Sequence, residues 1–213
     1  MRGLFERSFG VEFVGAKLRP RADEGYDRVM QEPRAGAWVT AGEAVRLLRR
    51  DFPFKRRAYL RADPVLVGSM ERFRGRVLVS WRGAQGSVEL GRLMRLWPQA
   101  LSVQYDRRWD EEVVEPGGVD VRDDLERLAA LLSVCGRLVT VSTTVAHIAA
   151  ALGVRVDLVI ADRGTGRRNN LLPWKWWCEK TPGRSAWYGD NVRVYRGMAE
   201  YEQAVKDERR HAA

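Results

Sequence analysis

The stretch Val139-Thr-Val-Ser-Thr-Thr-Val-Ala-His-Ile-Ala-Ala-Ala-Leu-Gly153 contains a strand, a polar turn and a helix in immediate succession. Residues 138–141 are mostly apolar and largely β-branched, which favours a short buried strand. The Ser-Thr-Thr run at 142–144 consists of good N-cap residues, so we expect a helix to begin there. Gly153 stands where the glycine that follows a helix is commonly found. A buried strand that leads directly into a helix is typical of α/β proteins.

The start of this helix has the chemistry of an anion site. The first backbone N–H groups of a helix have no partner within the helix, and the positive end of the helix dipole lies at the same place. Phosphate groups therefore bind readily at such positions. His147 lies about one turn into the expected helix, within reach of the same anion. Capping alone for the threonines, and packing alone for His147, are alternatives that the residues leave open.

Strands and helices alternate on both sides of this unit. We expect strands at 77–81, 101–105, 156–160 and 192–195, and helices at 90–97, 123–133 and 199–210. This alternation predicts a parallel sheet with helices on both faces, whose ligands bind beyond the carboxyl ends of the strands. Three polar turns are expected at that edge, at residues 80–83, 142–144 and 162–168.

Composition sets the broad class of protein. The chain has 213 residues, of which 45% are apolar, enough for one large domain or two small ones. No apolar run is long enough to span a membrane and no signal segment opens the chain, so we expect a cytoplasmic protein. Cys135 and Cys178 match no metal spacing and are expected to be free thiols. With two histidines in the chain, a histidine-rich metal site is excluded, and we expect neither metal nor cofactor.

A net charge of +9 and an isoelectric point near 10.0 favour anionic partners such as nucleotides, nucleic acid or anionic lipid. Most of the basic residues are arginines, however, and a composition rich in Arg and Ala also follows from a GC-rich genome. No zinc finger, helix-turn-helix signature or aromatic-basic RNA-binding motif accompanies the charge. Nucleic-acid binding therefore rests on charge alone.

The first part of the chain is harder to interpret, because glycines interrupt every periodic pattern. A short strand at 11–14 and a short helix at 44–50 are expected there. We treat residues 1–57 as a reduced N-terminal region and residues 58–213 as the main domain.

Four stretches of residues 57–208 resemble, in order, the heptosyltransferase-like glycosyltransferases of family 9, above all the form fused to tetratricopeptide repeats. They are Tyr59-Leu-Arg-Ala-Asp-Pro64, Val79-Ser-Trp-Arg-Gly83, the stretch 141–153, and the segment with Trp174-Lys-Trp-Trp177, Ser185-Ala-Trp-Tyr188 and Val192-Arg-Val-Tyr-Arg196. The resemblance implies the Rossmann-like C-terminal half of a GT-B glycosyltransferase. Such a half binds a nucleotide-diphosphate sugar as substrate, and the N-terminal half binds the acceptor. No metal is required if the protein itself supplies the charge that stabilises the leaving diphosphate.

The resemblance also implies a set of donor-binding residues. They are Trp81, Arg82, Gly83, Ser142, Thr143, Thr144, His147, Trp174, Lys175 and Trp176. The tryptophan cluster suits either a wall for the base or sugar, or a contact with another protein surface. The catalytic base is not identified.

Two features depart from the family pattern. Ser142 stands where the family usually has an aspartate, and residues 1–57 are too few for a full acceptor-binding domain. The acceptor half would therefore be reduced or supplied by another chain, and a homodimer is one arrangement. The alternatives to a transferase are a nucleotide-sugar-binding module that lacks turnover or needs a partner, and a nucleic-acid-associated modifying protein.

Overall fold

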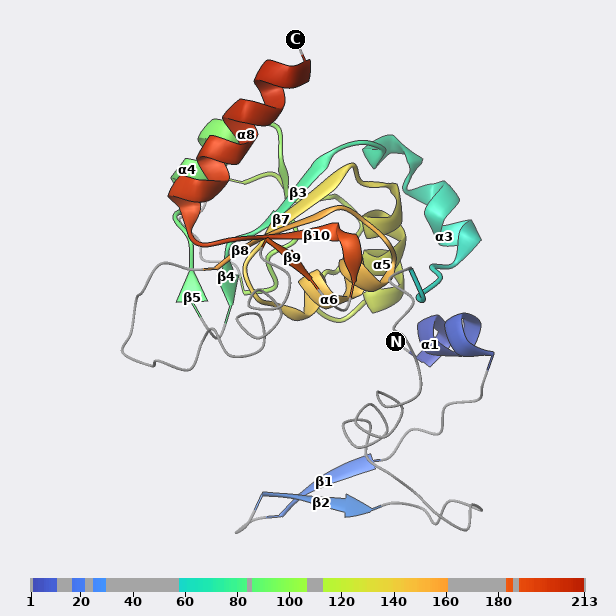
Figure 1. Cartoon of the computed structure of the whole chain (residues 1–213). Helices are drawn as coiled ribbons and strands as arrows, with labels where there is room; N and C mark the ends of the chain where they lie inside the picture. Colours follow the sequence, from blue (N-terminus) through green and yellow to red (C-terminus); the bar gives the residue numbers. More distant parts are fainter. Residues whose placement is uncertain are drawn as a thin grey trace, which may run out of the picture.

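The computed structural model describes residues 2–10, 17–21, 25–29, 58–83, 86–106, 113–160, 183–185 and 188–212. The strands of its main sheet are β3 (Val77–Ser80), β6 (Leu101–Ser102), β7 (Arg137–Thr140), β8 (Val156–Val159), β9 (Arg184–Ser185) and β10 (Gly189–Tyr195). Their order in the sheet is β6-β3-β7-β8-β10-β9 (Figure 1). The first five are parallel neighbours, and β9 is antiparallel at one edge. The expected α/β fold is confirmed, and the five-stranded parallel sheet is compatible with a Rossmann-like fold.

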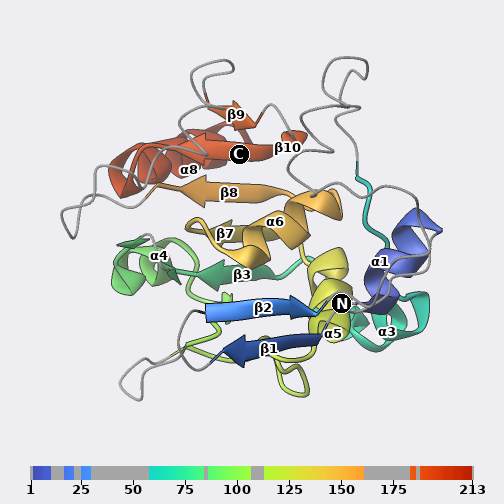
Figure 2. The ribbon, with the colours of Figure 1, turned by 90° about the horizontal axis from the view of Figure 1, so that it is seen from below.

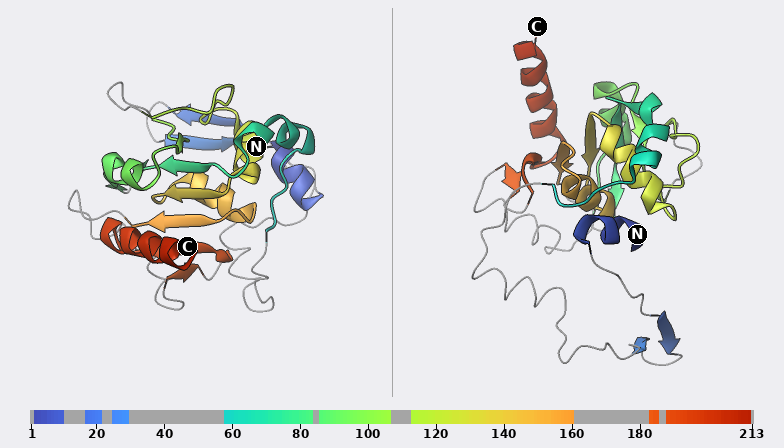
Figure 3. Two further views of the ribbon diagram at one scale, coloured as in Figure 1. Left: turned by 90° about the horizontal axis from the view of Figure 1, so that it is seen from above. Right: turned by 90° about the vertical axis from the view of Figure 1, so that its right-hand side faces the viewer.

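Helices cover both faces of the sheet. One face carries α1 (Arg2–Phe9), α3 (Pro64–Ser69), α5 (Leu125–Val134) and α6 (Thr144–Ala151), and the other carries α4 (Leu90–Leu96) and α8 (Met198–Ala212). A short 3-10 helix, η1 (Glu71–Phe73), follows α3, and a small hairpin of β4 (Arg82–Gly83) and β5 (Gly86–Ser87) follows β3. Figure 2 looks onto the face with α5 and α6, and Figure 3 presents α4 and α8 from the opposite side.

Successive side chains of each strand point into two different apolar cores, one on each face of the sheet. Leu78, Leu138 and Leu158 are fully buried against α5 and α6, whereas the residues that follow the first two, Val79 and Val139, are fully buried on the side of α4 and α8. Successive side chains of a strand point to opposite faces, so a sheet covered on both sides needs apolar residues at nearly every position. This requirement explains why the sequence shows short continuous apolar runs.

The chain reverses its direction of winding at the centre of the sheet. From β3 it passes through α4 to β6 at one edge, then returns through α5 to β7 and continues outward through β8 to β10. The strands β3 and β7, which lie on either side of the reversal, are parallel neighbours. In open α/β sheets, ligands bind in the crevice outside the carboxyl ends of the strands at such a reversal, the topological switch point.

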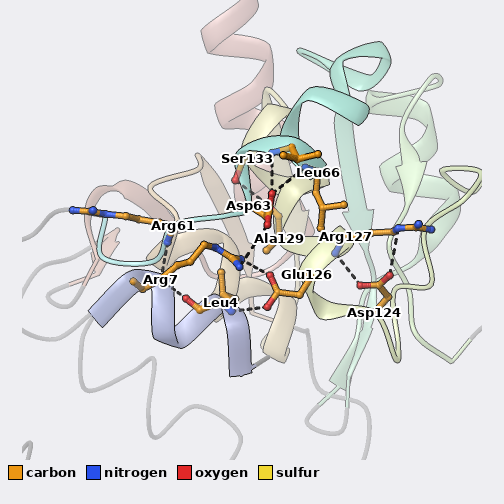
Figure 4. A network of polar contacts seen from close by, with 12 residues as sticks. Leu4, Arg7, Arg61, Asp63, Leu66, Asp124, Glu126, Arg127, Ala129 and Ser133 are labelled. Atoms are coloured by element: carbon orange, nitrogen blue, oxygen red, sulfur yellow. Dashed lines mark hydrogen bonds and ion pairs between the residues drawn. The ribbon is translucent and has the colours of Figure 1, made fainter. Parts of the chain in front are cut away.

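The first helix of the chain belongs to this body (Figure 4). Leu4 is 1% exposed within the core beneath α5, and its backbone N–H donates to the Glu126 carboxylate at 2.5 Å. Arg7 forms an ion pair with the same carboxylate, and the Arg61 N–H donates to Ser8 Oγ at 2.8 Å. The core therefore includes a helix from the region 1–57, which the sequence analysis set apart from residues 58–213.

Little else of that region is described. The strands β1 (Lys17–Arg21) and β2 (Gly25–Val29) form an antiparallel hairpin of their own. The strand expected at 11–14 and the helix expected at 44–50 lie outside the described residues. Within the described ranges, every helix is too short or too polar to traverse a lipid bilayer.

An ion network fixes α8 to the sheet. Asp157 on β8 is fully buried, and its carboxylate lies 3.1 Å from Arg137 Nη1. Glu208 on α8 accepts from Arg137 at 2.6 Å and from both terminal nitrogens of Arg155 at 2.7 Å. Buried charges are tolerated when they are paired, so this network anchors the last helix at a defined position on the sheet.

Candidate functional site

The turn after β3 and the turn after β7 are in contact at the switch point. A Cβ atom placed on Gly83 would lie 2.9 Å from the carbonyl oxygen of Ser142 and 3.1 Å from Thr143 Cγ2. Glycine is therefore required here because the two backbones approach so closely. The expected turn at 80–83 is instead the end of β3 followed by the strand β4, and it lies beside the expected turn at 142–144. The third expected turn, 162–168, lies outside the described residues.

A buried glutamine holds the first of these turns. Gln104 is 3% exposed, and its Oε1 accepts from the backbone N–H groups of Trp81 and Arg82, both at 3.0 Å. Its Nε2 donates to the Arg82 carbonyl oxygen at 2.9 Å and to a carboxylate oxygen of Asp106. Because the amide uses both ends, the turn has one favoured conformation. The sequence analysis did not identify Gln104, although a polar residue at the end of a buried strand is a usable signal.

Trp81 and Arg82 have different environments. The Trp81 side chain is 2% exposed and packs with Val88 and Leu93 in the core next to α4. Arg82 is largely buried, with Nε 3.4 Å from Asp106 Oδ2, and its Nη2 donates to the Asp106 carbonyl oxygen. Trp81 therefore contributes its backbone to the site, while Arg82 is held at the rim beside Asp106.

The second turn begins α6 as the sequence predicts. Thr143 is the N-cap, and its hydroxyl oxygen accepts from the Ala146 N–H at 3.4 Å. The same hydroxyl lies 3.2 Å from Thr140 Oγ1 and is almost fully buried. Thr144 is exposed at the first helical position. The groups of this turn that suit an anion are therefore the backbone N–H groups at the start of α6 and the Thr144 side chain.

The end of α6 also agrees with the sequence. Gly153 has φ of 81°, and its N–H donates to the Ala150 carbonyl at 3.1 Å, while Val154 N–H donates to Ala149 at 3.0 Å. This pair of bonds is the Schellman arrangement that closes many helices. Both ends of the strand–turn–helix unit are thereby fixed by local residues.

His147 lies about one turn into the helix and contacts Tyr188. Its Nδ1 is 2.7 Å from the Tyr188 hydroxyl, and the two rings lie 6.0 Å apart in a tilted arrangement. The Tyr188 hydroxyl is in turn hydrogen-bonded to that of Tyr59, whose backbone N–H donates to Ala151 at the end of α6. Although the residue is exposed, desolvation lowers the pKa of His147, which favours the neutral imidazole.

A groove lies beside the end of β6. It has a volume of about 660 Å³ and is lined by Gln104 and Tyr105, by the loop from Glu115 to Asp123, and by Arg127 in α5. Gln104 lines the groove and also holds the Trp81–Arg82 turn, so the two features share a side chain. The volume falls within the range of pockets that hold small organic ligands.

The remaining candidates are placed as follows. Trp174, Lys175 and Trp176 lie outside the described residues. In the ranges that the structure describes, no three His, Cys, Asp or Glu side chains are grouped as metal ligands. Cys135 is a free, half-buried thiol, and burial raises its pKa to about 12, so it is a poor nucleophile at neutral pH.

Comparisons of the chain with protein-family models, with curated proteins and with solved structures give no match. The fold and the site alone therefore define the class of protein. The chain is an α/β protein whose parallel sheet brings Gly83 and the start of α6 together at its topological switch point, with a groove beside the neighbouring strand β6.

Proposed function

We propose that this chain is a glycosyltransferase of the GT-B type, which transfers a sugar from a nucleotide-diphosphate sugar to an acceptor. The observation that carries the proposal is the contact of Gly83 with Ser142 and Thr143, which joins the two turns at the switch point. In sheets of this kind, that position is where nucleotides bind.

The start of α6 suits the diphosphate. The helix presents backbone N–H donors, the positive end of its dipole and the exposed Thr144 side chain in one place. When the sugar–oxygen bond breaks, negative charge develops on the departing nucleoside diphosphate. Donors that are already oriented stabilise that charge more than they stabilise the intact donor substrate, which is the requirement for catalysis.

The groove beside β6 suits the nucleoside. Tyr105, with 42% of its surface exposed, offers an aromatic face at the groove, and aromatic faces stack with bases. Asp106 follows Tyr105 in the loop after β6, and dinucleotide-binding folds reach ribose hydroxyls from an acidic residue beyond the corresponding strand. Because Gln104 connects groove and turn, a nucleoside in the groove would direct its phosphates towards the start of α6.

A second function is binding of a nucleotide sugar without turnover by this chain alone. The interactions of Asp106 favour it. This carboxylate lies beside the switch point but is engaged by Arg82 and Gln104, so it is badly placed to accept a proton from an acceptor hydroxyl. A partner chain or a second copy would then supply the base.

Two measurements separate these functions. Isothermal titration calorimetry with nucleoside diphosphates and their sugar conjugates tests for the donor site. Release of the nucleoside diphosphate from the bound conjugate, with and without candidate acceptors, tests for turnover. Binding with release supports the transferase, binding without release supports the binding module, and the absence of binding contradicts both.

A further inference from the structure

Three side chains from distant parts of the sequence form one hydrogen-bonded string. Tyr59 lies where the chain enters the main body, Tyr188 directly precedes β10, and His147 lies on α6. Tyr59 is bonded through its hydroxyl to Tyr188, and Tyr188 is bonded to His147 Nδ1 at 2.7 Å. The bond to Tyr188 constrains the orientation of the imidazole.

The direction of the hydrogen bonds follows from the chemistry of the groups. A phenol hydroxyl is a stronger proton donor than the N–H of a neutral imidazole, and a short O–H···N bond is the arrangement that the pair favours. Tyr188 has a single hydroxyl proton, so when it donates to His147 its oxygen accepts from Tyr59. Each of the two hydroxyls then donates once within the string, and Tyr59, which is 43% exposed, lies at its outer end.

We infer that Tyr188 is a positioning residue, whose hydroxyl donates to His147 Nδ1 and thereby keeps the imidazole proton on Nε2. The role of His147 that follows rests on the proposed function. An uncharged imidazole protonated at Nε2 donates a hydrogen bond from that nitrogen, which suits a phosphate oxygen of the donor. It does not suit removal of a proton from the acceptor, so the catalytic base must be another residue.

The chain contains its own reference for this inference. Its second histidine, His211 near the end of α8, has Nδ1 2.6 Å from the carbonyl oxygen of Asp207. A carbonyl oxygen only accepts, so His211 Nδ1 must carry the proton. The two histidines are therefore expected to hold their protons on opposite nitrogens when both rings are neutral.

Long-range ¹H–¹⁵N NMR spectra of the ¹⁵N-labelled protein, recorded at mildly alkaline pH, test the inference directly. Nitrogens with and without a proton give well-separated signals, and His211→Ala assigns the remaining ring to His147. We expect His147 Nδ1 to be unprotonated and Nε2 to be protonated, with the reverse pattern at His211. A proton on His147 Nδ1 in the wild-type protein would overturn the inference, whatever the variants do.

Two matched variants test the role of the string. Tyr188→Phe keeps the ring but removes the donor, so we expect the His147 signals to move to the average of two tautomers. Tyr59→Phe removes a hydroxyl that does not touch His147, and the pattern should persist. An unchanged His147 pattern in Tyr188→Phe would also overturn the inference.

Titration with a nucleoside diphosphate distinguishes this inference from the proposed function. We expect Tyr188→Phe to bind about fivefold more weakly than the wild type, the effect of one misplaced neutral hydrogen bond. A wild-type protein that binds no nucleotide contradicts the proposed function and the phosphate role of His147, whereas the NMR pattern of the unliganded protein decides the role of Tyr188.

Discussion

Gly83 and Ser142 lie so close that a Cβ atom on the glycine would stand 2.9 Å from the serine carbonyl oxygen. The two residues belong to turns that follow β3 and β7, the neighbouring strands at which the sheet changes its direction of winding. The contact therefore determines the shape of the carboxyl edge where the proposed ligand binds.

Gly83→Ala should separate the two turns. Because the nearest atoms belong to the backbone, we expect a loss of about 1–3 kcal/mol in the free energy of unfolding, measured by urea denaturation. Gly117→Ala is the matched control, since a Cβ there meets nothing within 4 Å. Equal stability of the two variants would show that the close approach carries no constraint.

Replacing Gln104 should loosen the same turn from the other side. Gln104→Ala leaves the N–H groups of Trp81 and Arg82 without their buried acceptor, which should cost about 2–3 kcal/mol of unfolding free energy. Gln104→Glu retains the acceptor but cannot donate to the Arg82 carbonyl, so this variant should also lose a measurable part of its unfolding free energy. Gln99→Ala, at an exposed position, should have little effect. Unchanged unfolding free energy in both Gln104 variants would argue against a role for Gln104 in holding the turn.

The first helix should be part of the cooperative unit. Leu4→Ala removes a side chain that is 1% exposed in the main core, so we expect a loss of about 2–4 kcal/mol in a single unfolding transition. Phe9→Ala, on the same helix but 47% exposed, should lose less than about 1 kcal/mol. Similar small losses in both variants, measured by urea denaturation, would mean that α1 does not contribute to the core.

Acid should weaken the attachment of α8 through Glu208. The hydrogen bonds from Arg155 lower the pKa of this carboxyl group to about 2, well below its value of about 4.3 in an unfolded chain. The unfolded state therefore binds the proton more tightly, and the stabilisation by Glu208 is complete above about pH 5 and disappears as the pH falls towards 2. Burial raises the pKa of Asp157, so its contribution to stability changes with pH in the opposite sense. Asp157 is present in every variant compared.

Glu208→Gln should consequently have a smaller loss of stability than the wild type between about pH 5 and pH 2. Unfolding by urea across this range measures the difference. Glu89→Gln, which alters a carboxyl group that makes no capping bond at the start of α4, provides the control. If the unfolding free energy of the wild type and that of Glu208→Gln fall in parallel as the pH is lowered, Glu208 is not the source of the acid sensitivity.

The sequence predicts the centre of this fold well because its signals are local. The strands β3, β7 and β8 are short Val- and Leu-rich runs. The expected strands 77–81 and 156–160 each extend one residue beyond the observed ones, and the expected strand 138–141 is displaced by one residue from β7. Helix α6 was predicted with both of its ends because Thr143 caps one and Gly153 closes the other. In these elements, local propensity and tertiary packing favour the same structure.

The features that the sequence does not reveal depend on contacts between distant residues. Helix α1 is held by the contact of Leu4 with Glu126, two residues that are far apart in the chain. The expected strand 101–105 ends at Ser102, because the Gln104 amide bonds to the backbone after β3. Trp81 was predicted to contact the donor, but its ring is buried against α4, a distinction that depends on which face a strand end presents. Likewise, nothing near His147 in the sequence indicates Tyr188 as its partner.

We propose that a phosphate-bearing ligand binds at the start of α6, and Thr144→Asp places a negative charge at that position. Thr144 is exposed at the first helical position, where a negative charge favours the helix dipole, so the thermal stability of the variant should be unchanged or slightly raised. The same charge would repel a bound phosphate strongly. Gln99→Asp adds an equal charge at the opposite edge of the sheet and serves as the control.

The measurement is calorimetric titration of the wild type, Thr144→Asp and Gln99→Asp with a panel of nucleoside diphosphates. We expect at least one nucleotide to bind the wild type and Gln99→Asp alike, and to bind Thr144→Asp at least about tenfold more weakly while that variant remains fully folded. Binding of equal strength to all three proteins, or binding to none, would contradict the account.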